Sequence, residues 1–326
     1  MRLRVFIFKV LRKIFRQRKI CLENTDMFVQ YYNQEANNYI RNTLHSYFLD
    51  GKKKGLMLAK FGTIELSTFV CFLQHEKNKF LKNYFYGIRG YYNFFRKEQL
   101  EALCNNAGFF PNDIGLCKKF NNQFLEDAKC VDILASYCYN EKYLSPEMPD
   151  CVRVNLNGYY APFLWENPWT MELKDKKVLV IHPFAESIRK QYEKRNLLFS
   201  DPNVLPEFKE LRVIKAVQSA AGNKPEDFDT WFDALNSMEK QIDTVDFDVA
   251  IIGCGAYGMA LAAYVKRLGK VAIHLAGWTQ MLFGIYGNRW INDQPEFSKY
   301  INEHWIRPSA SERPKDLNKV EKGCYW

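Results

Sequence analysis

The stretch DFDVAIIGCGAYGMALAAYVKRLGKVAIHLAG, residues 246–277, decides the fold of this chain. Its apolar run at 249–252 is short and is bounded by polar residues and glycine, which is typical of a buried strand. Residues 259–269 have helical spacing, and residues 270–276 form a second apolar run. Two strands joined by a helix of this length are expected to lie parallel, because antiparallel neighbours need only a short turn. The stretch therefore predicts a strand–helix–strand unit of a parallel sheet.

The same alternation continues towards the N-terminus. Further strands are expected at 55–62, 176–184 and 210–217, with helices at 64–77, 185–195 and 225–242. Strands that alternate with helices indicate a mostly parallel sheet. We therefore predict an α/β fold, Rossmann-like, with helices on both faces of the sheet.

The chain is expected to divide into a short N-terminal helix and one large domain. The predicted parts are an N-terminal helix at 1–22, a single α/β domain at 23–326, a helical and aromatic insertion at about 77–170, and an irregular tail at about 291–326. The insertion is rich in Tyr, Phe and Asn. Helices are expected at 96–108 and 121–128 and a strand at 131–137, but the topology of the segment does not follow from its pattern. A hydrophobic content of 47% over 326 residues is ample for a core. The nine cysteines form no C-x-x-C pair, which favours reduced thiols.

The net charge of +9 is concentrated at the N-terminus. Eight of the 46 Lys and Arg residues fall in the first twenty positions, which leaves 38 basic against 37 acidic residues elsewhere. A nucleic-acid-binding protein normally carries its basic surface on the folded domain, so nucleic acid is not an expected partner.

The N-terminal segment has the pattern of an amphipathic helix. Its apolar residues recur at helical spacing, at Leu3, Phe6, Ile7, Val10, Leu11, Ile14 and Phe15, and basic residues fill the other face. This pattern predicts a helix that lies on an anionic membrane surface through residues 1–20. Charges interrupt it too often for a membrane span of about 20 apolar residues. The alternatives are a disordered basic tail and a helix docked on its own domain.

The glycine motif at 253–258 fits the template G-x-G-x-x-G, which cradles phosphate at the start of a helix. The predicted binding residues here are Gly253, Gly255, Ala256, Tyr257 and Gly258. A dinucleotide site also needs an acid at the end of the next strand, but that strand ends Ile-His-Leu-Ala. The motif therefore favours the phosphate of a nucleotide or nucleotide sugar over NAD, and a purely structural turn stays open.

A second strand–turn–helix junction lies at KFGTIE, residues 60–65. Lys60, Gly62 and Thr63 bring a cation, a flexible turn and a hydroxyl to a helix start, where a phosphate is favourable. Glu65 supplies a carboxylate for a divalent ion or a sugar hydroxyl. The alternative is that Thr63 is an N-cap and Glu65 a favourable acid of the first turn.

Two more junctions carry polar side chains. His182 and Glu186 follow or end the strand at 176–184, and either is a candidate general base. Thr279, Gln280 and Arg289 lie among aromatic residues at 277–290, a composition that suits a nucleobase or a sugar. The alternatives are a structural histidine and an aromatic segment packed over the core.

Two of these stretches together resemble a known family. LAKFGTIE, residues 58–65, is similar to the Arg-Phe-Gly-Asp-x-Glu signature of GT-D type glycosyltransferases, and residues 246–277 look like their C-terminal strand, glycine turn, helix and strand. The stretches at 176–192, 282–290 and 323–326 also resemble poorly characterised bacterial proteins of capsule and surface-polysaccharide synthesis.

The resemblance implies a Rossmann-like enzyme that transfers sugar from a nucleoside diphosphate sugar. Glu65 matches the second carboxylate of the family, Lys60 stands in place of Arg, and Thr63 in place of Asp. One carboxylate alone is a poor cage for Mn²⁺ or Mg²⁺, so metal dependence stays open at Glu65. NAD is not expected.

We therefore expect a glycosyltransferase of bacterial surface-polysaccharide synthesis, in the cytoplasm and peripherally bound to the inner face of the cell membrane. Its acceptor would be a glycan or a lipid-linked molecule. Two other classes stay open: an NAD(P)-dependent oxidoreductase and a non-catalytic nucleotide-binding scaffold.

Overall fold

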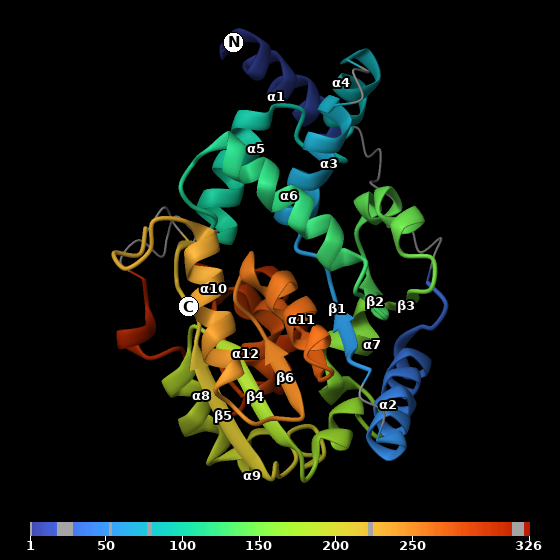
Figure 1. Cartoon of the computed structure of the whole chain (residues 1–326), viewed down its shortest axis with the longest axis vertical. Coiled ribbons are helices and arrows are strands. Elements are labelled where there is room, and N and C mark those ends of the chain that lie inside the picture. Colours follow the sequence, from blue (N-terminus) through green and yellow to red (C-terminus); the bar gives the residue numbers. More distant parts are fainter. Residues whose placement is uncertain (1, 18–28, 52–53, 77–79, 221–223, 315–322) are drawn as a thin grey trace.

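The computed structural model describes residues 2–17, 29–51, 54–76, 80–220, 224–314 and 323–326, and a seven-stranded sheet forms its centre (Figure 1). The strands are β1 (Leu56–Ala59), β2 (Ile133–Ser136), β3 (Val152–Asn155), β4 (Lys177–His182), β5 (Glu210–Lys215), β6 (Val249–Ile252) and β7 (Val271–His274). Their order is β3-β2-β1-β7-β6-β4-β5, and every neighbouring pair is parallel. The predicted α/β fold with a parallel sheet is confirmed.

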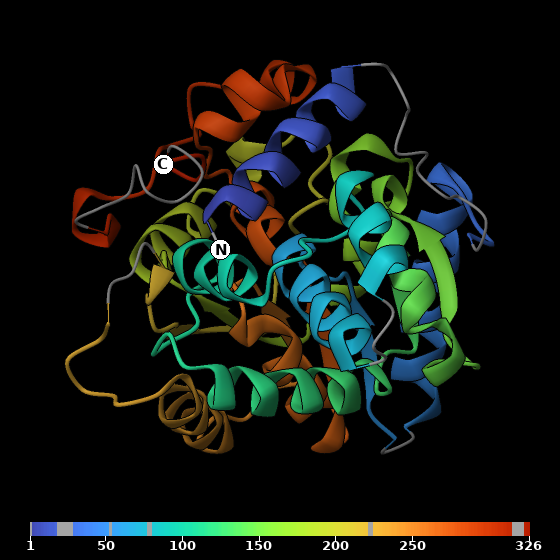
Figure 2. The same cartoon turned by 90° about the horizontal axis from the view of Figure 1, so that it is seen from above.

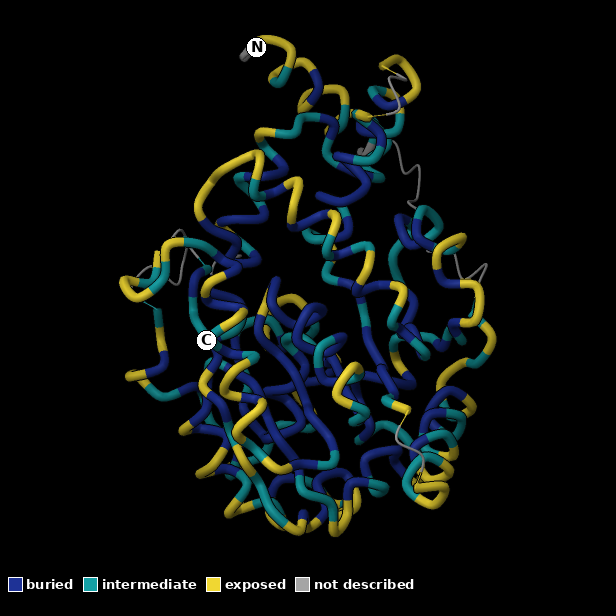
Figure 3. The backbone as a smooth tube through the Cα atoms, in the orientation of Figure 1, coloured by how far each residue is buried: buried dark blue, intermediate teal, exposed yellow. Residues whose placement is uncertain are grey.

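Helices cover both faces of this sheet. One face carries α3 (Thr63–Glu76), α5 (Arg96–Ala102), α6 (Ile114–Ala128), α10 (Trp231–Asp243) and α11 (Tyr257–Arg267). The other carries α2 (Asn33–Asp50), α7 (Leu156–Tyr160), α8 (Ala185–Tyr192), α9 (Arg195–Leu198) and α12 (Thr279–Leu282). The central strands are buried on both faces, as Figure 3 shows, which explains why their sequences are continuous apolar runs.

The chain segments that follow neighbouring strands pass over opposite faces of the sheet. After β1 and β6 the chain enters α3 and α11 on one face, and after β4 and β7 it enters α8 and α12 on the other. Since β7 lies between β1 and β6, with β4 beyond β6, the outgoing connections alternate between faces across these four strands. Such reversals open a crevice at the carboxyl edge of a parallel sheet, where ligands usually bind.

The segment at 77–170 contains more than the expected helices and aromatic residues. It also supplies β2 and β3, which extend the sheet beyond β1. The strand expected near Ile133 is present, and β3 is an additional strand at the edge.

The amphipathic helix expected at the N-terminus is present as α1 (Arg2–Gln17), while residues 18–22 lie outside the described part of the chain. It packs on α4 (Phe80–Ile88) at one end of the long axis of the molecule (Figures 1 and 2). Among the described residues, no helix is both long and apolar enough to cross a membrane.

Candidate functional site

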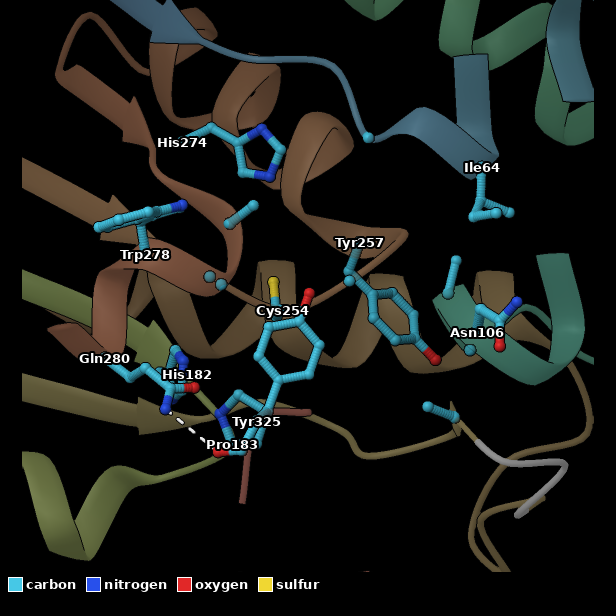
Figure 4. Close-up of a pocket in the computed structure, with 18 of the residues that line it drawn as sticks. Ile64, Asn106, His182, Pro183, Cys254, Tyr257, His274, Trp278, Gln280 and Tyr325 are labelled. Carbon is cyan, nitrogen blue, oxygen red and sulfur yellow. Dashed lines mark hydrogen bonds between the residues drawn. The ribbon is translucent and has the colours of Figure 1, made fainter. Parts of the chain in front are cut away.

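A cavity of about 360 Å³ lies at the carboxyl edge of the sheet (Figure 4). All seven strands contribute a lining residue at their last position or within two residues after it: Lys60, Tyr137, Leu156, His182, Val217, Gly253 and His274. The volume falls in the range of small-molecule sites, about 300–1,000 Å³. The cavity is therefore the candidate site that the strand connections predict.

Ten of the residues expected from sequence meet in this cavity. They are Lys60, Gly62, Thr63, Glu65, His182, Gly253, Gly255, Tyr257, Gln280 and Arg289. Four others, Glu186, Ala256, Gly258 and Thr279, do not line it. Segments as distant in sequence as 60–65 and 289 thus share one site.

Lys60 follows β1 and extends its side chain beside Tyr137, with the ammonium nitrogen 5.1 Å from the ring centre. Burial is the main cause that lowers the pKa of Lys60, and Arg289 lowers it further, whereas Cys138 and Glu65 act in the opposite direction. Among the described residues no group accepts a hydrogen bond from this ammonium. Lys60 is consequently available to an anionic ligand.

The turn after Lys60 is held by hydroxyl groups. Tyr137 donates to the carbonyl of Phe61 at 2.7 Å, and the Thr63 hydroxyl lies 3.2 Å from the Tyr137 hydroxyl. The Glu65 carboxylate folds back against Gly62, so closely that a Cβ on this glycine would collide with it. These contacts fix the start of α3 and bring its one first-turn acid to the cavity.

The three glycines of the 253–258 turn are tightly packed against other parts of the protein. Gly255 has a φ of 58°, and a Cβ there would lie 2.7 Å from the carbonyl oxygen of Ala107. A Cβ on Gly258 would collide with the ring of His274, and Gly253 is equally crowded. Each glycine therefore has a structural reason that requires no phosphate.

Most amides of this turn already donate to protein carbonyls, namely those of Gly253, Ala256, Tyr257 and Gly258. The Ala256 amide donates to Ala107 at 2.9 Å, which ties the turn to the π-helical turn at Leu103–Ala107. The amides of Cys254 and Gly255 have no acceptor among the described residues. A phosphate at this turn would be held by these two amides rather than by the whole motif.

The His182 ring is neutral and is held in one tautomer. Its Nδ1 accepts a hydrogen bond from the Phe184 amide at 3.0 Å, so the neutral ring carries its proton on Nε2. Burial lowers the pKa of His182 to about 3, because the charged form would lose its hydration. The ring is therefore arranged to donate a hydrogen bond, which argues against the expected role as a base.

Glu186 is exposed on α8 and lies away from the cavity. The start of α8 is instead capped by the buried carboxylate of Glu312, which accepts from the amides of Glu186 at 2.8 Å and Ser187 at 3.3 Å. The helix end that a phosphate could occupy is thus filled by an acid of the protein. The geometry gives Glu186 no support as a base.

His274 is a lining residue to which the sequence analysis gave no role. It ends β7, is 3% exposed, and neither ring nitrogen makes a hydrogen bond with a described group. Burial, and to a smaller extent the charge of Lys60, lower the pKa of His274 to about 3, while the Lys60 backbone beside the ring acts weakly against this. A buried polar group without a partner is costly. The signal in the sequence is a polar residue at the end of an apolar strand.

Several aromatic rings line the cavity. Figure 4 shows Trp278, Tyr257 and Tyr325 on different sides of the same space, which His182 and His274 also border. The side-chain amide nitrogen of Gln280 already donates a hydrogen bond to the backbone carbonyl of Tyr325, at 3.1 Å. Flat rings beside a few polar groups suit the faces of a nucleobase or a sugar.

The Arg289 guanidinium stacks on the Tyr325 ring, 4.4 Å from its centre. Arg289 also lines the cavity. It adds a second positive charge to that of Lys60 on the cavity wall.

The residues around the cavity do not fit a divalent metal ion. Glu65 is the one carboxylate among the lining residues, and the part of the chain that the structure describes contains no group of three His, Cys, Asp or Glu arranged for a metal. Mg²⁺ and Mn²⁺ prefer several oxygen ligands, which the lining does not offer. With Lys60 and Arg289 against Glu65, the lining instead favours an anion.

Comparisons of the chain with protein-family models, curated proteins and solved structures found no significant match. The structure itself shows the parallel α/β architecture, and a fold of this kind is compatible with many functions.

Proposed function

We propose that this protein is a glycosyltransferase that binds a nucleoside diphosphate sugar in the cavity. The observation that carries the proposal is the Lys60 ammonium, which lines the cavity and has no acceptor among the described residues. A cation that burial penalises is costly to keep unless a ligand compensates it. A diphosphate supplies that compensation through charge-assisted hydrogen bonds.

A nucleotide explains the cavity better than a small inorganic anion. The aromatic wall around Trp278 and Tyr325 offers stacking surface that a free phosphate would not use. The ring of His274 and the amides of Cys254 and Gly255 make no hydrogen bond with a described residue and can offer one to a ligand. A ligand with phosphate, hydroxyl and ring components matches all three kinds of group.

Sugar transfer requires that the departing diphosphate be stabilised and that the acceptor hydroxyl lose its proton. Lys60 and Arg289 are the cations that line the cavity, and we assign them the first task. Glu65 is the carboxylate that lines it, and we assign it the second task or the binding of a donor hydroxyl. No step in this scheme uses a metal ion.

The acceptor and the setting follow from the resemblance noted in the sequence. Similarity to GT-D enzymes and to surface-polysaccharide proteins supports a glycan or lipid-linked acceptor in bacterial surface-polysaccharide synthesis. The proposed location is the cytoplasmic face of the cell membrane.

The second candidate is a non-catalytic nucleotide-binding protein of the same machinery. The observation that favours it is that Glu65 is the one acid among the described lining residues, whereas Glu186, predicted as a candidate base, lies outside the cavity. Such a protein would bind a nucleotide and consume no sugar donor.

The test begins with thermal-shift titrations of UDP, GDP, CMP and NADH. The nucleoside diphosphate that stabilises the protein is then supplied as a series of its sugar donors, and nucleotide release is measured with and without candidate acceptors. Stabilisation by NADH and by no nucleoside phosphate would overturn the proposal. Stabilisation without release from any donor would favour the second candidate.

The Glu65→Gln variant tests the catalytic assignment, with Glu186→Gln as a matched control on an exposed helix. General-base catalysis contributes about 10²- to 10⁴-fold, so Glu65→Gln should reduce turnover by at least 10²-fold. Nucleotide affinity should change little in either variant. Equal turnover in both variants would remove Glu65 from the mechanism.

A further inference from the structure

A large apolar surface is exposed at the end of the molecule formed by α1 and α4. Its members on α1 are exposed by 39–70% and those on α4 by 49–80%. They are Leu3, Phe6, Ile7, Val10, Leu11, Ile14, Phe80, Leu81 and Phe85, and we call them the α1–α4 surface. Nine exposed large apolar residues on two neighbouring helices are more than the scattered single residues of an ordinary surface, and they indicate an interaction site.

The opposite side of α1 is fixed to the domain. Phe8 is 2% exposed and contacts Tyr84 edge to face, with ring centres 5.9 Å apart. Gly87 makes room for it, since a Cβ at this position would lie 2.8 Å from the Phe8 ring. The Arg12 guanidinium also donates to the carbonyl of Gly90 at 3.4 Å. α1 is thus seated by one face, and its second apolar face points away from the protein.

The helical positions confirm this arrangement. At 100° per residue, Phe8 and Arg12 fall on one side of α1, whereas Leu3, Val10 and Ile14 fall roughly opposite. Docking on the domain therefore leaves the apolar stripe uncovered. The sequence leaves a helix docked on its own domain and a helix on a membrane surface open as alternatives. In this arrangement α1 can be both, because it docks through one face and exposes the other.

Basic residues border the α1–α4 surface. Arg4, Lys9 and Lys13 are exposed on α1, and Lys82 is exposed next to Leu81 on α4. Neither helix contains an acidic residue. The charges on the two helices are therefore all positive, and the nearby acid Glu98, on α5, interacts with Lys9 alone among these four.

We propose that the α1–α4 surface binds an anionic lipid bilayer, with the apolar residues of both helices inserted among the lipids and the basic residues at the phosphate level. Interfacial helices bind in this way, through apolar burial and attraction to anionic lipids. A second copy of the chain fits less well, because a symmetric contact would bring together two surfaces bordered by Arg4, Lys9, Lys13 and Lys82, and neither helix carries an acid to pair these charges.

This inference adds α4 to the membrane contact that the N-terminal sequence alone predicts. It also places the bilayer relative to the cavity. α3 begins at the cavity with Thr63 and ends just before α4, and its 14 residues span about 20 Å. The cavity would then lie within reach of an acceptor whose lipid portion remains in the membrane.

The test measures co-sedimentation of the full chain with phosphatidylcholine vesicles, with and without phosphatidylglycerol. The protein should bind the anionic vesicles and lose binding as salt is raised. Leu81→Ser on α4 is compared with Leu49→Ser on α2, since these leucines are 80% and 73% exposed. Leu81→Ser should weaken vesicle binding roughly tenfold, and Leu49→Ser should leave it unchanged.

A charge variant separates the two contributions. Lys13→Gln should weaken binding to anionic vesicles roughly fivefold, with little change on neutral ones. Equal vesicle binding by Leu81→Ser and Leu49→Ser would overturn the role of α4. A dimer in size-exclusion chromatography that Leu81→Ser converts to a monomer would overturn the bilayer as the occupant. Neither readout involves nucleotide, so failure here is distinct from failure of the proposed function.

Discussion

Replacing Lys60 with methionine should stabilise the free protein and weaken nucleotide binding at the same time. Burial lowers the pKa of this lysine from 10.5, which means that the fold penalises its charge. Methionine has a similar shape and no charge, so it removes the penalty. Single substitutions that remove an unfavourable feature of a folded protein commonly add about 0.5–2 kcal/mol of stability. The expected effect on the free energy of unfolding lies in that range.

The pH dependence follows from the same shift. Between the lowered pKa and 10.5, the unfolded chain holds a proton that the folded chain does not, so the stability of the wild type rises with pH there. The advantage of Lys60→Met is therefore full below the folded-state pKa and disappears as pH approaches 10.5. Denaturant unfolding at a series of pH values measures it.

Nucleotide affinity should decrease in the Lys60→Met variant, although its stability increases. A hydrogen bond to a charged group contributes about 1.5–3 kcal/mol, so Lys60→Met should weaken nucleoside diphosphate binding roughly 10- to 150-fold. Because the diphosphate favours the ammonium form, wild-type affinity should fall as pH rises through the free-state pKa of Lys60. The variant should lack this pH dependence. Calorimetric titration of both proteins measures the difference.

Lys240→Met provides the control, because Lys240 is an exposed lysine on α10, outside the cavity. It should change neither stability nor affinity appreciably. If Lys60→Met and Lys240→Met bind nucleotide equally well, the assignment of Lys60 to the diphosphate is wrong. If Lys60→Met is less stable than the wild type, the ammonium has a structural partner and the reasoning from burial fails.

Three further outcomes are expected. Gly258→Ala should cost about 1–3 kcal/mol in urea unfolding because its Cβ collides with the His274 ring, while the control Gly115→Ala, with more space at a helix start, should not. Stability should fall as pH drops from about 6.5 towards about 3, because the unfolded chain protonates His182 and His274 before the folded chain does; His274→Asn should make this fall shallower. Glu312→Ala should cost about 0.5–2 kcal/mol by uncapping α8, measured by thermal unfolding.

Much of the fold follows from the sequence because the central strands are buried on both faces. β1, β6 and β7 are continuous apolar runs next to helical patterns, which leaves little choice of structure. β3 has no such signal, since its sequence VRVN is half polar and three of its four residues are partly exposed at the edge. Edge strands pair on one side only, and the pattern of the chain does not reveal which segment completes a sheet.

The candidate site follows partly from the same logic. The carboxyl ends of parallel strands share one edge, and Lys60, His182 and Gly253, which end or follow three such strands, line one cavity. Contacts between remote segments do not follow from local pattern. The Ala107 carbonyl at the glycine turn and the Glu312 carboxylate at α8 come from distant parts of the chain. The Ala107 carbonyl occupies a position where the sequence alone suggests space for a phosphate, and the Glu312 carboxylate caps a helix start where the sequence suggests only a base.

The structure gives the glycine motif a smaller part in ligand binding than its sequence suggests, and it gives Lys60 a larger one. A G-x-G-x-x-G turn is taken as a phosphate cradle because its amides are free and its glycines permit close approach of a ligand. Here the close approach is made by Ala107 and His274, and four of the amides are already used. The turn thus serves mainly to pack α11 and the π-helical turn onto the sheet. Among the described groups that line the cavity, the Lys60 ammonium and the His274 ring, at the ends of β1 and β7, have no hydrogen-bonded side-chain partner, and a bound ligand can supply one to both.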